Sequence, residues 1–466
     1  MAHILVFPYP AQGHMLPLLD LTHKLALKGL TITILVTPKN LPILSPLLSP
    51  HPSIQTLVLP FPHHPKLPLG VENVKDIGNH GNPMITSALS KLQEPIIQWF
   101  KSHPAPPRAI LSDFFLGWTN GLAEQLNVPR VAFFSSGCYL SNVLHYLLDH
   151  MDAVRELEVI EFPDLPRSPS IMSAHLPTII KKYKESDLDW RIVRDGLLAN
   201  FSCWGCVFNS FEALEGEYVA HLRGKLGHNR VYDVGPLGLI GERGSKRLAR
   251  IQQDSDTTNS LFNWLDDQPE GSVLYVCFGS QKLLTKAQTE ALAAGLEHSM
   301  IRFVWVVKLA MSIPAEGEGG HEPILDEFEK RVGERGIVVK GWAPQVEILN
   351  HKAVGGFMSH CGWNSLLESV VAGVTIMTWP MEADQFINAR LLADDLGIAV
   401  RACDGEDAVP DPIELARIIS ETMSGHLPQK EKAKEFKDKA FEAVQEGGSS
   451  SKSLDEFVTE LNKLEI

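Results

Sequence analysis

The sequence predicts an α/β protein with two doubly wound domains, and three observations support this prediction. The chain has 466 residues, of which 44% are hydrophobic, which is too long for one ordinary domain and enough for two or three. An apolar run, a helical pattern and a second apolar run follow one another near the start, and the same alternation returns after residue 272. Strands that alternate with helices are typical of parallel sheets of the Rossmann type, whose ligands bind at the carboxyl ends of the strands.

The first alternation predicts an N-terminal domain over residues 1–240. Its strands are predicted at residues 4–7, 31–36, 109–115 and 130–134. Leucines at near-helical spacing predict a helix that Gly29 ends, which completes a parallel strand–helix–strand unit. Residues 38–68 are crowded with proline and lack a period, so we expect a long loop region with short elements there that contacts a ligand.

The second alternation predicts a C-terminal domain over residues 260–445. Its strands are predicted at residues 272–278, 303–307, 337–340, 353–358 and 398–401, and its helices at 285–298, 385–396 and 410–423. The polar stretch 241–259 is interpreted as the linker between the domains, and residues 446–466 as a final charged helix.

Composition excludes several classes of function. A formal net charge of −14 argues against nucleic acid or an anionic membrane surface as a partner, because both select basic patches. Six cysteines are too few for a disulfide framework in so long a chain, the first residues lack a secretory leader, and no apolar run reaches the length of a membrane span. We therefore expect a soluble, cytoplasmic protein.

Three patterns could suggest a metal or redox site, and each has a simpler interpretation. The histidine pair at 63–64 has no cysteine or acidic partner at ligand spacing, so we expect solvated loop side chains. Two Asp-x-Asp pairs, at 187–189 and 254–256, follow no strand and are interpreted as solvated charges. Cys203 and Cys206 form a single Cys-x-x-Cys pair inside an apolar run, which favours buried strand thiols. No metal is expected.

An anion site is predicted where the strand at 353–358 gives way to a helix. The turn reads Ser359-His360-Cys361-Gly362-Trp363, and a helical pattern begins at Asn364 and Ser365. The free N–H groups and the positive dipole end of such a helix attract an anion, and Gly362 lets a phosphate approach the backbone closely. An equally weighted alternative is that Ser365 and Glu368 form a capping box, which would only satisfy the first turn.

His14 and Asp113 lie where doubly wound folds keep their chemistry. His14 falls in the turn between the first strand and its helix, and Asp113 falls near the carboxyl end of a later strand. Each also has a structural alternative, because a histidine at a helix start is often a cap or a solvated side chain, and Asp113 could be the N-cap of the next helix.

The stretch from Trp342 to Gln385 resembles the signature of plant family 1 glycosyltransferases, which use UDP-sugars and have a GT-B fold of two Rossmann-like domains facing a cleft. The resemblance extends over the 44 positions of this stretch. Lys352 and Thr375 stand where the family usually has proline, and neither position carries a role. The resemblance extends to Pro10-x-x-Gly13-His14-x-x-Pro17 and to Ser112-Asp113, which are similar to two N-terminal motifs of the family.

The resemblance implies a role for each residue of the signature. At the uridine, Trp342 stacks on the base, the Ala343 backbone reads its edge, and Gln345 and Glu368 hold the ribose hydroxyls. At the diphosphate lie Ser280, His360, Gly362, Asn364 and Ser365, and at the sugar lie Trp363, Asp384 and Gln385. The residue types suit these roles, since an indole takes a flat base, a carboxylate accepts from a diol, and helix N–H groups neutralise a leaving diphosphate. Ser135 and Ser136 are further candidates for sugar or phosphate contact, with core-edge hydroxyls as the alternative.

The resemblance also implies the reaction. His14 is the general base and Asp113 accepts a hydrogen bond from it, so an acceptor hydroxyl attacks the anomeric carbon from the face opposite UDP and inverts it. No metal or other cofactor is expected. The last helix is expected to return to the N-terminal domain.

The expected donor is UDP-glucose, because Trp363 and Gln385 go with glucose in the family; rhamnosyl or xylosyl transfer is the alternative. The expected acceptor is a flavonoid or another small phenolic, and we expect a monomer. Two rivals from other classes are a nucleotide-sugar binding protein that has lost catalysis and a dehydrogenase. The intact pair His14 and Asp113 opposes the first, and the Gly/Glu loop at 316–320 does not have the spacing that the second requires.

Overall fold

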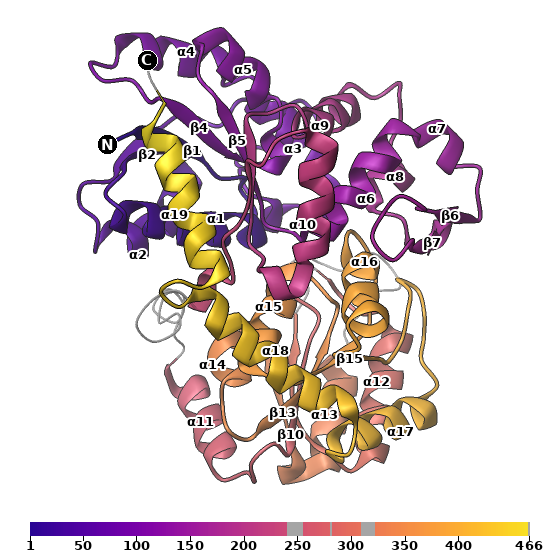
Figure 1. Ribbon diagram of the computed structural model, residues 1–466. Coiled ribbons are helices and arrows are strands. Elements are labelled where there is room, and N and C mark those ends of the chain that lie inside the picture. Colours follow the sequence, from indigo (N-terminus) through magenta and orange to yellow (C-terminus); the bar gives the residue numbers. More distant parts are fainter. Residues whose placement is uncertain (240–254, 280–281, 309–321, 465–466) are drawn as a thin grey trace. The chain divides into compact units, whose positions relative to one another are not determined.

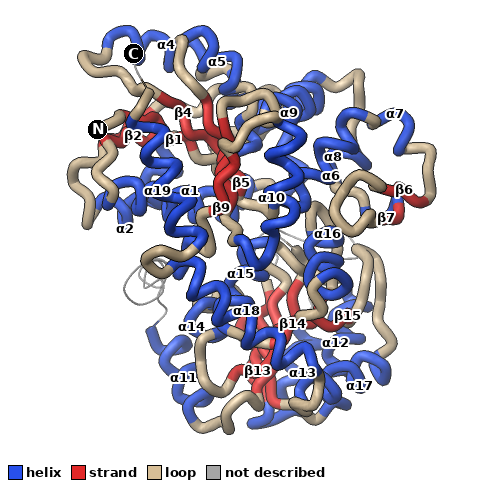
Figure 2. Tube along the Cα trace, viewed as in Figure 1, coloured by secondary structure: helices blue, strands red, loops and turns tan. Residues whose placement is uncertain are grey.

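The computed structural model describes residues 1–239, 255–279, 282–308 and 322–464 (Figure 1). The chain divides into two compact units: unit 1 comprises Met1–Glu242 and Glu442–Ile466, and unit 2 comprises Arg243–Phe441. Each unit contains one large parallel sheet with helices on its faces, as the red strands and blue helices of Figure 2 show. The predicted α/β class with two Rossmann-like domains is confirmed.

The sheet of unit 1 has seven strands in the order β3-β2-β1-β4-β5-β8-β9, and all of its neighbours are parallel. The strands are β1 (His3–Phe7), β2 (Thr31–Val36), β3 (Gln55–Val58), β4 (Ala109–Asp113), β5 (Arg130–Phe134), β8 (Gly205–Phe208) and β9 (Val231–Asp233). Counted from β1, this is the 3-2-1-4-5-6 order of the Rossmann fold with one strand added. The order reverses between β1 and β4, which is where sheets of this kind bind ligands.

The helices of unit 1 cover both faces of this sheet. They are α1 (Gln12–Leu27), α2 (Ser45–Leu48), α3 (Asn82–Ser90), α4 (Gln93–Ser102), α5 (Thr119–Leu126), α6 (Cys138–Asp149), α7 (Met151–Val154), α8 (Thr178–Lys182), α9 (Leu188–Ala199), α10 (Glu212–Leu226) and α19 (Ser449–Asn462). Along β1, Ile4 and Val6 join a core with α1 and α19, whereas Leu5 and Phe7 join another with α3, α4 and α5. A strand covered on both faces needs such a continuous apolar run, because its side chains alternate. A small antiparallel pair, β6 (Val159–Glu161) and β7 (Ser170–Met172), is separate.

The helix α19 completes unit 1 from the far end of the chain. Ser450 Oγ donates to the Gly235 carbonyl at 2.6 Å, and the Ala2 N–H donates to Asn462 Oδ1 at 2.8 Å. Phe457 is fully buried in the core beside α1. Figure 1 shows α19 in yellow next to α1 in the same unit.

The sheet of unit 2 repeats the same design with six strands in the order β12-β11-β10-β13-β14-β15. The strands are β10 (Val273–Cys277), β11 (Arg302–Val307), β12 (Gly336–Lys340), β13 (Val354–Ser359), β14 (Thr375–Thr378) and β15 (Ala399–Arg401). The helices are α11 (Ser255–Asp266), α12 (Lys286–Ser299), α13 (Glu322–Val332), α14 (Gln345–Leu349), α15 (Trp363–Ala372), α16 (Gln385–Arg390), α17 (Pro412–Met423) and α18 (Pro428–Val444). Here the order reverses between β10 and β13.

The differences from the predicted elements are local. The strand predicted at 109–115 ends at Asp113, because Phe114–Leu116 form a 3₁₀ turn, η4. The helix α11 begins at Ser255, inside the stretch interpreted as linker, and the rest of that stretch up to residue 254 lies outside the described residues. The strands β3, β9 and β14 were not predicted: β3 lies in the proline-rich stretch 38–68, and β14 lies in an apolar run that is interrupted at Gly373 and Pro380. Among the residues described, no helix combines the length and the hydrophobicity that a membrane crossing requires.

Candidate active site

In unit 1, His14 and Asp113 meet at the point where the strand order reverses. His14 is the third residue of α1, which follows β1, and Asp113 is the last residue of the neighbouring strand β4. The predicted position of His14 in a turn was wrong by a few residues, because α1 already begins at Gln12. The early start places the imidazole in the first helical turn, above the carboxyl end of β4.

The two side chains form a hydrogen-bonded pair. His14 Nδ1 lies 3.0 Å from Asp113 Oδ2 and 3.1 Å from Oδ1. The Asp113 side chain is 0% exposed, whereas that of His14 is 21% exposed. Because a carboxylate only accepts, Nδ1 carries the hydrogen and Nε2 is left with a free lone pair. Asp113 also has the predicted capping role, since its Oδ1 accepts from the Phe115 N–H at 2.9 Å.

Three aromatic rings surround the imidazole, and none of them was predicted. Phe114 stacks on it at 5.4 Å between ring centroids, and Phe115 and Tyr9 approach edge-on at 5.0 and 5.3 Å. The Tyr9 hydroxyl donates to Asn82 Oδ1 at 2.8 Å, which fixes that ring from α3. Burial raises the pKa of Tyr9, so its hydroxyl remains a neutral donor. The signal in the sequence was the position of two phenylalanines directly after Asp113.

In unit 2, His360 lies against two glycines at the corresponding reversal point. Gly279 follows β10, and Gly362 is the N-cap of α15, which follows β13. A Cβ atom added at either glycine would come within 2.7 Å of His360 Nε2. A side chain at either position would force the ring to shift, so glycine leaves the ring its place, and the first N–H groups of α15 begin beside it.

His360 is neutral in this state. Burial lowers its pKa to about 4, and its Nδ1 has no hydrogen-bond partner among the described residues. The predicted neutralisation of an anion by His360 therefore cannot rest on a charge that is already present. An anion that enters the site would first be held by neutral hydrogen-bond donors, namely the N–H groups at the start of α15 and the imidazole.

Gln345 joins the two residues that the capping-box alternative had paired. Its Nε2 donates to Ser365 Oγ at 3.0 Å and to Glu368 Oε2 at 2.7 Å. The capping-box alternative is wrong, because the N-cap of α15 is Gly362 and Ser365 already lies inside the helix. Burial raises the pKa of Glu368 to about 7, against the opposing effect of the bond from Gln345.

Trp342 and Ala343 precede this group. The Trp342 side chain is exposed, at 38%, whereas Ala343 is buried. An indole with that exposure can offer a flat face to a base.

Two of the predicted sugar-binding residues, Asp384 and Gln385, lie where the turn after β14 leads into α16, and the third, Trp363, begins α15. Gln385 Oε1 accepts from the Met381 and Glu382 N–H groups at 2.9 and 3.0 Å, which leaves its NH₂ group as the end that can donate elsewhere. Asp384 Oδ2 accepts from Asn388 Nδ2 at 2.7 Å. Trp363 is buried.

Asn388 was missed by the sequence analysis. Its Nδ2 also donates to the Cys361 carbonyl at 3.0 Å, so it joins the turn after β13 to the turn after β14. Both turns contain a non-glycine residue at positive φ, Cys361 at 68° and Ala383 at 55°. Such strain persists where the surroundings enforce it and is frequent at functional sites. A buried asparagine within the apolar run Phe386-Ile387-Asn388-Ala389 was the available signal.

Two further predicted donor residues lie outside the described part of unit 2. Ser135 lies in unit 1, at the end of β5, where it is buried like its neighbour Ser136. Ser280 lies outside the described residues. Asn364 and Ser365 occupy the first turn of α15, as predicted.

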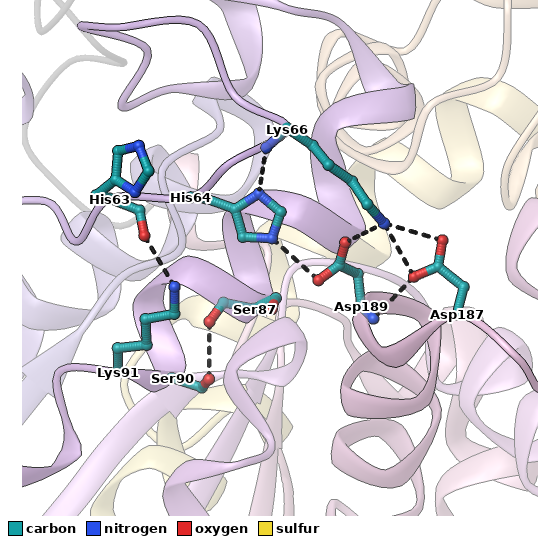
Figure 3. A network of polar contacts seen from close by, with 8 residues as sticks. All are labelled: His63, His64, Lys66, Ser87, Ser90, Lys91, Asp187 and Asp189. Atoms are coloured by element: carbon teal, nitrogen blue, oxygen red, sulfur yellow. Dashed lines mark hydrogen bonds and ion pairs between the residues drawn. The ribbon is translucent and has the colours of Figure 1, made fainter.

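The interpretation of His64 and Asp189 as solvated side chains was wrong. Figure 3 shows them in one polar network, with His64 Nε2 at 3.0 Å from Asp189 Oδ1 and Lys66 Nζ at 2.8 Å from Asp189 Oδ2. His64 and Asp189 are each only 5% exposed. The Lys66 N–H donates to His64 Nδ1, so the imidazole carries its hydrogen on Nε2 and donates to the carboxylate. A separation of 125 residues hid this pair from a search for local spacing.

Two further patterns were interpreted without a metal, namely the cysteine pair at 203 and 206 and the Asp-x-Asp pair at 254–256. Cys203 and Cys206 are buried and free, although Cys203 precedes β8 rather than lying in it. The pair at 254–256 begins outside the described residues. In the part of the chain that the structure describes, no group of three His, Cys, Asp or Glu side chains is arranged to hold a metal ion.

Comparison with known proteins identifies the family. The family model described as UDP-glucoronosyl and UDP-glucosyl transferase matches residues 250–403. UDP-glycosyltransferase 89A2 of Arabidopsis thaliana is 50% identical, over 99% of this chain and 96% of its own length. Flavonol 3-O-glucosyltransferase UGT89B1 of Arabidopsis thaliana is 47% identical, over 98% of this chain and 95% of its own.

Solved structures agree over the same extent. The crystal structure of Arabidopsis thaliana UGT89C1 complexed with UDP-L-rhamnose has a TM-score of 0.80 at 37% identity, covering 99% of both chains. The same protein complexed with quercetin gives a TM-score of 0.79 at 36% identity, again over 99% of both chains. The chain described here therefore belongs to the plant family 1 UDP-glycosyltransferases, which are enzymes with the GT-B fold.

Proposed function

We propose that this enzyme transfers glucose from UDP-glucose to a hydroxyl of a flavonoid or a similar small phenolic, with inversion at the anomeric carbon. The observation that carries the proposal is the pair of contacts from His14 Nδ1 to the buried Asp113 carboxylate. A histidine held in this way has one defined tautomer and one open nitrogen, which is what a general base needs.

In the proposed reaction the acceptor hydroxyl gives its proton to His14 Nε2. Its oxygen attacks the anomeric carbon, the bond from that carbon to the diphosphate oxygen breaks, and the electron pair leaves with UDP. Asp113 stabilises the imidazolium that forms. The rings of Tyr9, Phe114 and Phe115 hold the imidazole in place and keep water from most of its surface.

The donor is proposed to lie on the residues of unit 2. Trp342 and Ala343 take the uracil, and Gln345 with Glu368 takes the ribose. His360, Gly362, Asn364 and Ser365 take the diphosphate together with Ser280, and Trp363, Asp384 and Gln385 take the sugar. The N–H groups at the start of α15 accept the developing charge, so the proposed reaction uses no metal. The room that Gly279 and Gly362 leave around His360 supports this placement.

Glucose is preferred over rhamnose because the relative at 47% identity is named a glucosyltransferase. The NH₂ group of Gln385, oriented by the bonds to its own oxygen, can donate to a hydroxyl of either sugar. The related structure with UDP-L-rhamnose keeps rhamnose as the alternative sugar. The flavonoid acceptor rests on the flavonol named in that relative and on the quercetin complex.

The test is a product assay with a flavonol and, separately, UDP-glucose, UDP-rhamnose and UDP-xylose. We expect glucoside with an inverted anomeric centre, and a fall in kcat of about 100-fold to 10,000-fold for His14→Ala. His23→Ala, which removes another histidine from α1, is the matched control and should keep full activity. Unchanged turnover of His14→Ala would remove the proposed base, and donor binding without any product would favour the catalytically silent alternative.

A further inference from the structure

A buried arginine lies beneath the His14–Asp113 pair. Arg130 begins β5, next to β4, and is 1% exposed. Its side chain runs along β4 towards the carboxyl end, where Nε donates to Ser112 Oγ at 2.9 Å and Nη2 makes a longer contact of 3.5 Å with the Asp113 carbonyl. A guanidinium in this position brings a full positive charge close to the carboxylate that orients His14.

The hydrogen bond from Arg130 to Ser112 begins a chain in which each group donates to the next. Ser112 Oγ lies 2.8 Å from Thr119 Oγ1, and Thr119 Oγ1 donates to the Leu116 carbonyl at 2.6 Å. Because Arg130 can only donate and Thr119 uses its hydrogen on Leu116, Ser112 must donate to Thr119. A chain of aligned hydrogen bonds therefore runs from the buried charge to the far end of η4, and each bond polarises the next.

The whole turn η4 is held by buried polar side chains. The Asp113 carbonyl faces Arg130, the Phe114 carbonyl accepts from Asn200 Nδ2 at 3.0 Å, and the Leu116 carbonyl accepts from Thr119. Asp113 is the N-cap of this turn, and the turn carries the two phenylalanine rings that contact His14. The contacts of Arg130, Asn200 and Thr119 with the backbone around η4 thus fix the geometry of the proposed base.

The groups that face this charge are few. Burial lowers the pKa of the Arg130 guanidinium, while Cys203, Cys206 and Asp113 act in the opposite direction. The hydrogen bond with Cys206 lowers the pKa of the Cys203 thiol against the effect of burial. On its other side Asp113 faces His14 and Tyr9.

We propose that Arg130 is a positioning residue of the reaction: its positive charge attracts the Asp113 carboxylate, and its hydrogen-bond chain holds the backbone around Asp113 so that the carboxylate stays aimed at His14. A buried charge is costly unless an opposite charge compensates it, so the guanidinium and the carboxylate stabilise each other across the strand pair. The inference rests on the proposed function, in which His14 is the base.

The test compares kcat/KM against pH for the wild type, Arg130→Met and Arg130→Lys. Without the positive charge, the His14–Asp113 pair holds its proton more tightly, so the acid limb of the Arg130→Met profile should move up by about one pH unit. Arg130→Lys keeps the positive charge but loses the planar guanidinium, which donates several hydrogen bonds at once. The acid limb of its pH profile should therefore stay near the wild-type position, while kcat falls about tenfold. KM for the UDP-sugar should be unchanged in both. Arg230→Met, which removes an arginine stacked on Trp204, is the matched control and should have a wild-type profile.

An acid limb of Arg130→Met that coincides with the wild-type limb would overturn the inference. If Arg130→Met does not fold, Arg130→Lys alone tests the inference. A wild-type kcat in Arg130→Lys would show that the hydrogen bonds of the guanidinium do not orient Asp113. These outcomes are separate from the proposed function, which fails only if His14→Ala keeps its turnover.

Discussion

At the scale of the residue, His360 has its charge set by its surroundings. The ring lies between Gly279 and Gly362, and burial lowers its pKa to about 4, so it is neutral at physiological pH. A bound diphosphate reverses this balance, because a nearby negative charge favours the imidazolium. The proposed donor site would thus acquire its positive charge only when the ligand brings a negative one.

UDP binding is therefore expected to take up protons through His360. At about pH 6 the free ring is neutral, and the bound diphosphate raises its pKa towards or above the solution pH, so the wild type should take up as much as about one proton more than His360→Gln. Titration calorimetry in buffers of different ionisation enthalpy measures this number. Glu368, whose pKa burial raises to about 7, is present in both proteins, so its own proton change cancels in the difference. Equal proton numbers in the two proteins would contradict the prediction.

At the scale of the element, α9 is anchored at both ends. Its N-terminal end is held by Asp189 in the network with His64 and Lys66 (Figure 3). At the other end it lies against η4, where a Cβ on Gly117 would collide with the Gly196 carbonyl at 1.8 Å. The helix therefore connects the loop at 61–69 to the turn that carries Asp113.

Asp189→Asn is expected to loosen α9. The substitution removes the negative charge that Lys66 and His64 face in a buried site, which should cost about 2 kcal/mol. Burial acts to raise the pKa of Asp189, but its bonds from Lys66, Ser87 and His64 outweigh this and leave the pKa lowered. The wild-type stability from this carboxylate is thus present at neutral pH and is lost as pH falls through that lowered pKa, whereas the variant should not show this loss. Hydrogen exchange of the α9 amides and urea unfolding at two pH values measure both effects.

Asp187→Asn is the matched control. Asp187 is the N-cap of α9 and is more exposed than Asp189, and asparagine caps as well as aspartate does. Its cost should remain below about 0.5 kcal/mol. A larger effect of Asp187→Asn than of Asp189→Asn would mean that the cap, and not the ion network, holds the helix.

Most elements could be predicted from local pattern, and the anchoring of α9 could not. Apolar runs broken by glycine or proline located most of the strands of both sheets, because strand periodicity is written into adjacent residues. The pairs His64–Asp189 and Arg130–Asp113 join residues whose spacing carries no periodic signal. A loop and the helix α9 bring the first pair together, and two neighbouring strands bring the second together. The position of His14 beside Asp113 could be expected, since both follow strands at the reversal point, but the rings around it could not.

At the scale of the whole molecule, unit 1 depends on a helix from the far end of the chain. Phe457 of α19 is fully buried and lies 5.1 Å from the Tyr232 ring of β9. Phe457→Ala should therefore destabilise unit 1 by about 3–4 kcal/mol and lower the protection of the β9 amides against hydrogen exchange. Phe441→Ala, at a position that is 38% exposed, should cost less than about 1 kcal/mol. Similar melting of both variants and the wild type would show that the Phe457 ring does not contribute to the stability of unit 1.

The return of α19 has a consequence for how the protein is made. Ser450 and its partner Gly235 are separated by 215 positions, so the ribosome must finish all of unit 2 before the helix that covers β9 emerges. Until then the nascent sheet carries an uncovered apolar surface, at Tyr232 and Val234 among others, that chaperones can recognise. Premature termination anywhere in unit 2 would thus leave the half that carries His14 complete in its strands and still unable to close its core.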